Sequence, residues 1–438
     1  MSLAEFTDQW LSAVTPQISE GPGWLTDLRQ GAVEQFAVLG LPHARLENWK
    51  YTDVKALAKR NFSLPGTANA SADVESLVNK SSLGLDAIRL VFVDGVFSES
   101  ASTLGDLPAG VQVLPLAKNA NAAKPVLGQV AAANFSGFTA LNLAGWQDGV
   151  LIDLAANAVL EQPVYLQFVA TEQENPVLVQ PRILIKAGTH AQATIVEHYA
   201  GVEEAANLTN VVTEVDLADG ANITHYKLQQ ESAKQYHIAS MHIQQKRDSR
   251  FTSHNVCLGG KLARQDIQVE LSGEGAEVNL NGLYLGNGRQ HLDNHTLVNH
   301  NAPHTNSNED YKGILNDRSR GVFNGRAVVH KDAQKIEAHQ SNANLLLSDK
   351  AEIDTKPELE IYADDVKCSH GSTTGQLDEN ALFALRSRGL GEEMARGLLT
   401  LAFANEVIDR IEIPAVHDRL EDAVAGRLPE KFNLKGLV

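Results

Sequence analysis

Cys368 and His370 stand two residues apart near the end of a strand-like run, and this pair is the clearest chemical feature of the sequence. Residues 357–371 alternate apolar and polar side chains over much of their length, as a strand does. Side chains two apart on a strand project from one face, about 7 Å apart along the chain. A thiolate and an imidazole placed in this way can both bind a soft or borderline metal such as iron.

Three interpretations of this pair stay open from the residues alone. Two ligands do not complete a metal site, so a bound metal would need further donors from another chain or from a substrate. A buried structural cysteine beside a hydrogen-bonded histidine is the commoner arrangement. The third interpretation is a Cys–His nucleophile pair, although the sequence offers no orienting acid at a recognisable spacing and no Gly-x-Ser-x-Gly elbow.

Asp364 and Asp365 interrupt the alternation just before Cys368. Paired carboxylates of this kind occur in polysaccharide lyases and hydrolases. Adjacent residues of a strand point to opposite faces, however, so these two cannot easily flank one bond. We therefore interpret them as turn or bulge residues.

Four histidines lie within residues 291–304, namely His291, His295, His300 and His304. The spacing of His291 and His295 would suit a metal site on a helix, where positions i and i+4 share a face. The Asp, Asn and Pro residues of this segment disfavour helix, and no Glu follows His291 as a zinc protease requires. We predict that these histidines cap turns and pack between structural repeats.

The elements that must position these residues change character along the chain. From about residue 150 to 370, short β-branched runs alternate with Gly, Asn and Asp turns, and similar segments begin at Ala193, Ala221, Ser249 and Ala276. The intervals of 28, 28 and 27 residues predict the coils of a solenoid. An ordinary β-sandwich with regular hairpins is the alternative that the period leaves open.

Helical patterns flank this region. Residues 25–39 carry an apolar stripe that ends before Gly40 and Pro42, and residues 88–97 predict a hairpin with its turn at Asp94-Gly95. Beyond Gly371, two stripes predict a C-terminal helical unit that either packs on its own domain or docks a partner. The stripes are Met394, Leu398, Leu401, Ala402, Val407 and Ile408, and then Val416, Leu420, Val424 and Leu428.

Composition and charge exclude several function classes. A chain of 438 residues with 43% hydrophobic residues can bury a large core. Its 37 basic and 54 acidic residues give a net charge of −17, which argues against nucleic-acid and anionic-membrane partners. Cys257 and Cys368 are the only cysteines, which fits a reducing cytosol and excludes a site of four thiolates from this chain.

The sequence carries neither a recognisable targeting signal nor a nucleotide-binding loop. Glu5 and Asp8 stand where a signal peptide would carry basic residues, and no apolar run approaches the length of a membrane span, so we expect a cytoplasmic protein. The sequence has no Gly-x-x-x-x-Gly-Lys-Ser/Thr loop. A process driven by ATP would therefore take its ATPase from another chain.

Five blocks of the sequence are long enough to compare with known families. They are RLENWKYTDV (45–54), HNAPHTNSNEDYKGIL (300–315), RGVFNG (320–325), AQKIEAHQSNANLLLS (333–348) and the long block 354–389. Together they resemble the SufB/SufD family of iron–sulfur cluster assembly proteins. The Cys-Ser-His-Gly run that ends at Gly371, with Gly375 after it, resembles SufD more than SufB.

This resemblance implies a mainly β fold with a right-handed parallel β-helix core at residues 150–371. An N-terminal, mostly helical region with a short β segment (1–149) and a C-terminal helical domain (372–438) are expected to flank the core. The implied function is that of a non-catalytic scaffold subunit that helps to build nascent iron–sulfur clusters for transfer to apoproteins.

The resemblance also implies partners and ligands. A SufB-like paralogue is expected to pair with this chain through the β-helix cores, and a SufC-like ATPase to dock on the C-terminal helices. Cys368 and His370 are then expected at the paralogue interface, as ligands of iron or of a nascent cluster shared with SufB. The chain itself is expected to hold no nucleotide site, and alone it can form a homodimer.

Two other function classes remain as alternatives. A β-helix carbohydrate-active enzyme would need a lengthwise groove lined with acidic and basic groups. A Cys–His hydrolase would need Cys368 exposed with a depressed pKa and an oxyanion hole beside it.

Overall fold

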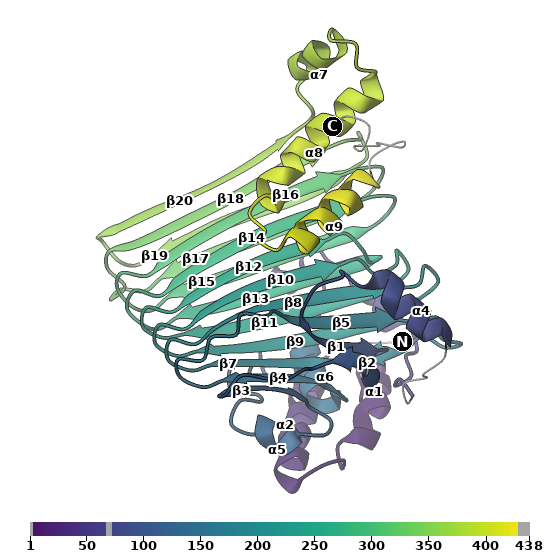
Figure 1. Ribbon diagram of the computed structural model, residues 1–438, viewed down its shortest axis with the longest axis vertical. Helices are drawn as coiled ribbons and strands as arrows, with labels where there is room; N and C mark the ends of the chain where they lie inside the picture. The colour runs from purple at the N-terminus through teal and green to yellow at the C-terminus, as the bar shows by residue number, and fades with distance from the viewer. Residues whose placement is uncertain (1–2, 67–71, 428–438) are drawn as a thin grey trace.

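The computed structural model describes residues 3–66 and 72–427, and its centre is a parallel β-helix (Figure 1). From residue 182 to residue 375, successive strands alternate between two sheets, so each coil adds one strand to each sheet. The strands of neighbouring coils run parallel and in register. The predicted solenoid is therefore confirmed, and the alternative of a sandwich of antiparallel hairpins is excluded.

The first sheet, as we name it here, runs in the order β2-β1-β5-β8-β10-β12-β14-β16-β18-β20. Its strands are β1 (Ile88–Val93), β2 (Val96–Thr103), β5 (Val164–Ala170), β8 (Gln192–Gly201), β10 (Asn222–Gln229), β12 (Arg250–Cys257), β14 (Glu277–Gly286), β16 (Asn306–Leu315), β18 (Ile336–Leu346) and β20 (Val366–Gly375).

The second sheet runs in the order β19-β17-β15-β13-β11-β9-β7-β4-β3, and the short β6 also pairs with β9. Its strands are β3 (Val111–Pro115), β4 (Gly149–Leu154), β6 (Leu178–Val179), β7 (Arg182–Ala187), β9 (Leu208–Leu217), β11 (Tyr236–Gln245), β13 (Leu262–Leu271), β15 (His291–His300), β17 (Arg320–Val329) and β19 (Glu352–Ile361).

The sequence repeat corresponds to coils of the first sheet, with one error of register. Ala193 pairs with Ile223, whereas the predicted first interval aligned it with Ala221. The later intervals are correct, because Ile223 pairs with Phe251 and Phe251 with Val278. A slip of two residues keeps the same side chains on the inward face, so the pattern survives the error. These four residues stack as one buried ladder between the sheets.

The N-terminal helices cover the outer side of the second sheet. α1 (Leu3–Val14), α2 (Gly23–Leu39) and α6 (Gly137–Gly145) share an apolar cluster with Leu184, Leu208 and Tyr236 of the sheet. In the predicted stripe of α2, Leu25, Ala32 and Phe36 are buried, whereas Leu28 is half-buried and Leu39 is exposed. The shorter helices are η1 (Thr15–Gln17), η2 (Glu47–Trp49), α3 (Lys55–Ala58), α4 (Ala72–Ser81) and α5 (Ala120–Ala123).

The predicted hairpin at Asp94-Gly95 is confirmed, with β1 and β2 antiparallel and both turn residues at positive φ. Positive φ at both central residues is the geometry that Asp-Gly adopts readily in a two-residue turn. β1 also pairs in parallel with β5. The hairpin therefore joins the β-helix and extends the first sheet into the region before residue 150.

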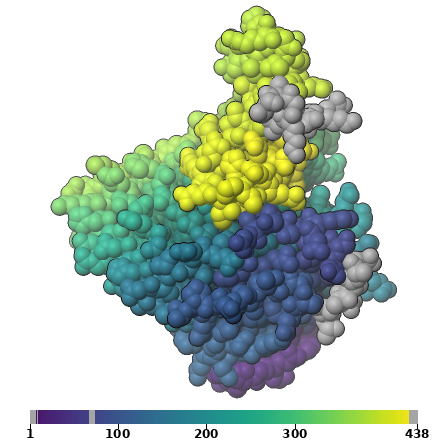
Figure 2. Space-filling view, in the orientation of Figure 1, coloured from purple at the N-terminus to yellow at the C-terminus, as the bar shows by residue number. Residues whose placement is uncertain are grey.

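The C-terminal helices pack along the outer side of the first sheet (Figure 1). α8 (Glu392–Ile408) and α9 (Pro414–Ala425) bury one face against sheet residues such as Leu283 and Ile314, whereas α7 (Glu379–Arg386) stands clear of the body in Figure 2. The α9 stripe is buried as predicted up to Val424, and Leu428 lies outside the described residues. In α8 the exposed Ala402 contradicts the predicted stripe, because the buried face passes through Thr400 and Ala404 instead.

Among the described residues, no helix is both long enough and apolar enough to span a membrane.

Candidate functional site

β20 carries both residues of the predicted Cys–His pair and is the last strand of the first sheet. Cys368 pairs in register with Ala338 on β18, and His370 pairs with Gln340. Ala338 and Gln340 are buried between the sheets. Since paired residues of neighbouring strands share a face, Cys368 and His370 both project from the inward side of β20.

The two side chains differ in exposure because β20 lies at the end of the sheet. Cys368 is half-buried in a small apolar cluster with Ala338, Ile336 and Ala363. His370 is exposed, since no further coil covers it among the residues that the structure describes. Edge strands of this kind keep one row of backbone N–H and C=O groups without a partner strand. The pair therefore lies at an open end of the β-helix.

The turn between β19 and β20 fixes where β20 begins. Asp364 and Asp365 lie in this turn, as predicted, and not on a strand face where two carboxylates could flank a bond. The Asp365 N–H donates to Gln334 Oε1 at 2.9 Å, and the Lys335 N–H donates to the Asp365 carbonyl oxygen at 2.6 Å. The last turn is thus stacked on the turn of the coil before it.

Partial burial also affects the protonation of Cys368. It raises the pKa of the thiol, so the neutral form is favoured in the isolated chain. A Cys–His hydrolase requires an exposed cysteine whose pKa is depressed. Partial burial and the raised pKa of Cys368 both argue against this alternative. A metal that binds the sulfur would have to displace the proton.

Cys368 and His370 do not form a closed metal site within the chain. Within residues 3–66 and 72–427, no group of three or more His, Cys, Asp or Glu side chains is placed to hold a metal ion. A structural site would present about four ligands. Two donors on an exposed strand can bind a metal tightly only together with donors from another molecule.

Cys257, the other cysteine, is not placed to bind a metal together with a second molecule. It is buried inside the β-helix, where its Sγ lies 3.4 Å from Gln229 Oε1, and it pairs with Tyr284 on the next strand. Burial raises the pKa of its thiol to about 12. Both cysteines are free thiols. Cys257 is therefore an inert interior group in the folded chain.

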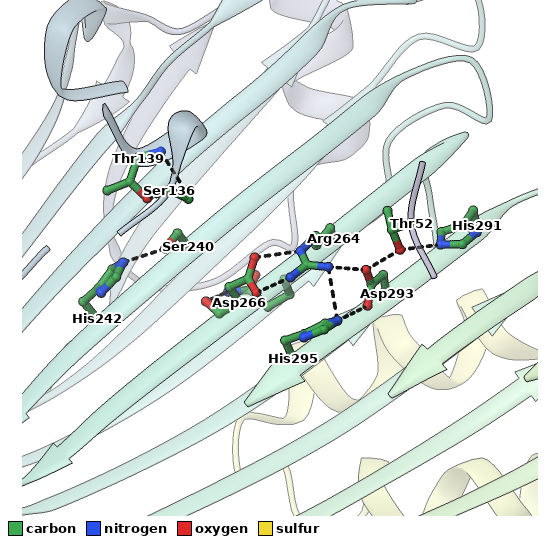
Figure 3. Close-up of polar contacts among 11 residues, drawn as sticks. Thr52, Ser136, Thr139, Ser240, His242, Arg264, Asp266, His291, Asp293 and His295 are labelled. Carbon is green, nitrogen blue, oxygen red and sulfur yellow. Dashed lines mark hydrogen bonds and ion pairs between the residues drawn. The ribbon is translucent and has the colours of Figure 1, made fainter. Parts of the chain in front are cut away.

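The histidine-rich segment forms strand β15, so the helical metal site is excluded (Figure 3). His291 Nε2 lies 2.8 Å from Thr52 Oγ1, and His295 Nε2 lies 2.9 Å from Asp293 Oδ1. Asp293 also accepts hydrogen bonds from Thr52 at 2.5 Å and from Arg264 Nη1 at 2.6 Å. These contacts connect the second sheet to the N-terminal region, so both histidines have structural partners.

Charge compensation stabilises this network. Burial by itself would raise the pKa of Asp293, but Arg264 and His295 hold it well below its ordinary range. Burial would likewise lower the pKa of Arg264, but Asp266 and Asp293 raise it. Arg264 and Asp293 are almost completely buried, and a buried charge is tolerated only when it is paired.

Of the other two histidines, His300 ends β15 and His304 lies in the turn that follows. His300 is buried, and its two ring nitrogens lie 2.8 Å and 2.9 Å from the hydroxyls of Thr305 and Ser307. His304 is exposed in the turn and has a positive φ. The prediction that these histidines serve turns and packing agrees with their contacts.

Sequence reasoning missed the polar side chains inside the β-helix. Glu197 Oε1 lies 3.1 Å from His225 Nε2, and Lys227 Nζ donates to Gln265 Oε1 at 2.6 Å. Glu309 on β16 is also buried, and burial raises its pKa to about 7. The sequence did carry a signal for these residues, because a polar residue at an inward-facing position of the repeat is unusual.

Two family models cover most of the chain. Residues 168–403 match the SufBD core domain of the SUF system for FeS cluster assembly, and residues 15–166 match the SufBD protein N-terminal region. The chain belongs to the SufBD family. The core model begins in β5 and ends within α8, so this helix falls inside the family's core together with the β-helix.

Individual SufBD relatives support a SufD-like assignment. An iron–sulfur cluster assembly SufBD family protein of Synechocystis is 36% identical over 414 residues, covering 92% of this chain and 91% of the relative. SufD of Escherichia coli is 31% identical, covering 91% and 92%. SufD of Bacillus subtilis is 24% identical, covering 92% and 94%. The chain is thus a SufD-like subunit of SUF iron–sulfur cluster assembly, and a carbohydrate-active β-helix enzyme finds no support.

Proposed function

We propose that this SufD-like chain supplies one half of a site for a nascent iron–sulfur cluster, with Cys368 and His370 as ligands. The observation that carries the proposal is that both side chains share the inward face of an edge strand at the open end of the β-helix. His370 can be reached there from outside, and a second molecule that covers the end can add the missing donors. Thiolate and imidazole are both known ligands of such clusters. Iron and sulfide are the cargo of this site.

The open end is also the surface that a SufB-like paralogue would cover. Unpaired edge strands are templates for another strand. β20 contains no proline, and open space surrounds Gly371 and Gly375. β19, the other edge, carries Pro357, which lacks an N–H for further pairing. These features support a heterodimer through the β-helix ends with β20 as the main contact strand, and a homodimer through the same strand when the chain is alone.

The C-terminal helices are the proposed dock for a SufC-like ATPase. α7 stands clear of the body, and the side chain of Phe383 on it is 73% exposed. A large apolar side chain in this position is typical of a partner-binding surface. The sequence has no P-loop, so we assign ATP hydrolysis to the partner and a non-catalytic scaffold role to this chain. Its place is the cytoplasm, without nucleic-acid or membrane partners.

Anaerobic co-expression of the chain with SufB-like and SufC-like partners tests this function. Mass measurement gives the subunit composition, and iron and sulfide analysis gives the cargo. We expect a three-component complex that contains iron and sulfide. The Cys368→Ser and His370→Ala chains should assemble into the same complex with several-fold less of both. Unchanged iron and sulfide in both variants would refute the ligand assignment.

A further inference from the structure

A column of three side chains leads from the buried interior to His370. On the inward side of the first sheet, Glu309 of β16, Gln340 of β18 and His370 of β20 occupy equivalent positions in register. Glu309 is 1% exposed and Gln340 is 4% exposed, whereas His370 is exposed at the open end. Gln340 thus stands between a buried carboxyl group and the proposed ligand.

Only one end of the Gln340 carboxamide has a hydrogen-bond partner. Its Nε2 donates to Glu309 Oε1 at 3.3 Å. Its Oε1 is buried and has no partner among the residues that the structure describes. Buried carbonyl oxygens are nearly always hydrogen-bonded. The Gln340 oxygen is therefore an available acceptor at the position that pairs in register with the exposed His370.

Gly325 on β17, in the opposite sheet, makes room for this carboxamide. A Cβ at residue 325 would overlap the Gln340 amide nitrogen and lie 2.7 Å from its Cδ. Only glycine leaves this space free. Gly325 and Gln340 belong to the sequence blocks 320–325 and 333–348, whose role the Cys–His pair alone does not explain.

We propose that Gln340 is a positioning residue for His370, whose imidazole donates one ring N–H to Gln340 Oε1 and turns its other ring nitrogen toward the metal. Neighbouring strands lie about 4.8 Å apart, so side chains at paired positions can meet. Histidine ligands usually donate their second ring N–H to a carbonyl or carboxylate oxygen, which fixes the tautomer and the ring orientation. This inference rests on the proposed role of His370 as a ligand.

Nitrogen NMR of the full chain, labelled at histidine, tests the hydrogen bond directly. At a pH where the imidazole is neutral, the two ring nitrogens report which of them carries the proton. His370→Ala identifies the signals of His370. We expect one dominant tautomer in the unaltered chain. In Gln340→Met, which removes the acceptor at similar volume, the two signals should move toward the average of a free imidazole. Identical His370 signals in both proteins would overturn the proposal.

Gln245 offers a matched control. It is buried, its Nε2 donates to the Glu277 carbonyl oxygen at 3.0 Å, and its Oε1 also has no partner among the described residues. Gln245→Met should disturb the interior in a similar way but leave the His370 signals in place. An equal shift in both variants would refute a specific role of Gln340. Gln340→Asn, which stays polar but withdraws the oxygen, provides a second variant if the methionine variant does not fold.

Iron analysis of the assembled complex separates this inference from the proposed function. Removing a group that hydrogen-bonds to a metal ligand typically weakens metal binding by about 10-fold or more. We expect a loss of iron affinity of this order in the Gln340→Met complex. If His370→Ala keeps the iron while Gln340→Met shifts the tautomer, the ligand assignment fails and the hydrogen bond stands. If His370→Ala loses the iron while Gln340→Met changes neither tautomer nor iron, the positioning role fails and the proposed function stands.

Discussion

The guanidinium carbon of Arg264 lies 3.9 Å from the ring centroid of Trp49. Trp49 belongs to the block 45–54, and Thr52 of the same block donates to Asp293 on the histidine-rich strand β15. These two segments therefore form one network, although they are about 240 residues apart in the sequence. This separation is far greater than a local turn can span. Its side chains are partnered with each other, which indicates a structural role for this network.

Replacing Arg264 should destabilise the fold strongly. Arg264→Met leaves Asp293 buried without its main countercharge, and breaking a buried pair in this way costs about 3–5 kcal/mol. Unfolding in urea measures the loss. Arg250→Met serves as the control, because Arg250 is largely exposed and its ion pair with Glu277 spans 3.6 Å. An exposed pair contributes at most about 1 kcal/mol. Equal losses in the two variants would contradict the structural role of Arg264.

The two cysteines should differ in reactivity. Cys257 is buried and burial raises the pKa of its thiol to about 12, whereas Cys368 is half-buried. The thiolate is the reactive form, so a thiol reagent should modify the folded chain at Cys368 alone. Mass spectrometry after alkylation gives the site. Cys368→Ser should remain unmodified until denaturant is added, and rapid modification of Cys257 in the folded variant would disagree with the structure.

Ligand loss and fold loss should separate at the Cys–His pair. His370 is exposed, so His370→Ala should change the free energy of unfolding by about 0.5 kcal/mol or less. Cys368 packs against Ala338 and Ile336, so Cys368→Ser should cost about 1 kcal/mol. Thermal unfolding of each subunit, next to iron and sulfide analysis of each complex, tests both values. Large destabilisation with full iron content would assign the pair to packing.

The overall fold could be predicted because its signal in the sequence is periodic. A ladder such as Ala193, Ile223, Phe251 and Val278 repeats a buried position once per coil, and this repetition predicts stacked strands. The error of register at Ala221 arose because turn lengths vary from coil to coil while the inward pattern does not. Cys368 and His370 were predicted on one strand face because alternation within a strand is a local property.

The surroundings of the site could not be predicted in the same way. Gln340 and Gly325 come from two other strands, and their contact depends on register across sheets, which no local pattern specifies. The network of Arg264, Trp49 and Asp293 likewise depends on tertiary contacts. In α8, the true buried face at Thr400 and Ala404 is set by the sheet beneath the helix.

Docking of the ATPase should depend on α7 and not on the helices that cover the sheet. Phe383→Ala removes a side chain that is 73% exposed, so stability should change by about 0.5 kcal/mol or less while partner affinity falls. Leu401→Ala should instead cost about 2–5 kcal/mol, because Leu401 is buried in the cluster between helices and sheet. Co-purification of the ATPase with each variant gives the comparison. Undiminished capture by Phe383→Ala would place the dock elsewhere.

Deleting everything after residue 375 is a poorer test of docking. It would uncover sheet residues such as Leu228, Leu283 and Ile314, which α8 and α9 now bury. Exposed apolar surface of this kind favours aggregation. Single substitutions on α7 therefore separate binding from folding better than truncation does.

Glu309 should make the stability of the chain fall with rising pH. Burial raises the pKa of this carboxyl group to about 7, above its ordinary value of 4.5. Between these values the folded chain holds the proton and the unfolded chain does not, so stability decreases as pH rises through this window and is constant above it. The shift corresponds to about 3 kcal/mol.

Glu309→Gln should therefore be more stable than the unaltered chain at pH 8, and this advantage should vanish near pH 4.5. Thermal unfolding across this range measures the difference between the two chains, in which the other titrating groups cancel. Glu337→Gln is the control, because Glu337 is exposed and Lys367 lowers its pKa, so its effect should be flat across the window. A Glu309→Gln effect that does not change with pH would show that this carboxyl group is ionised throughout.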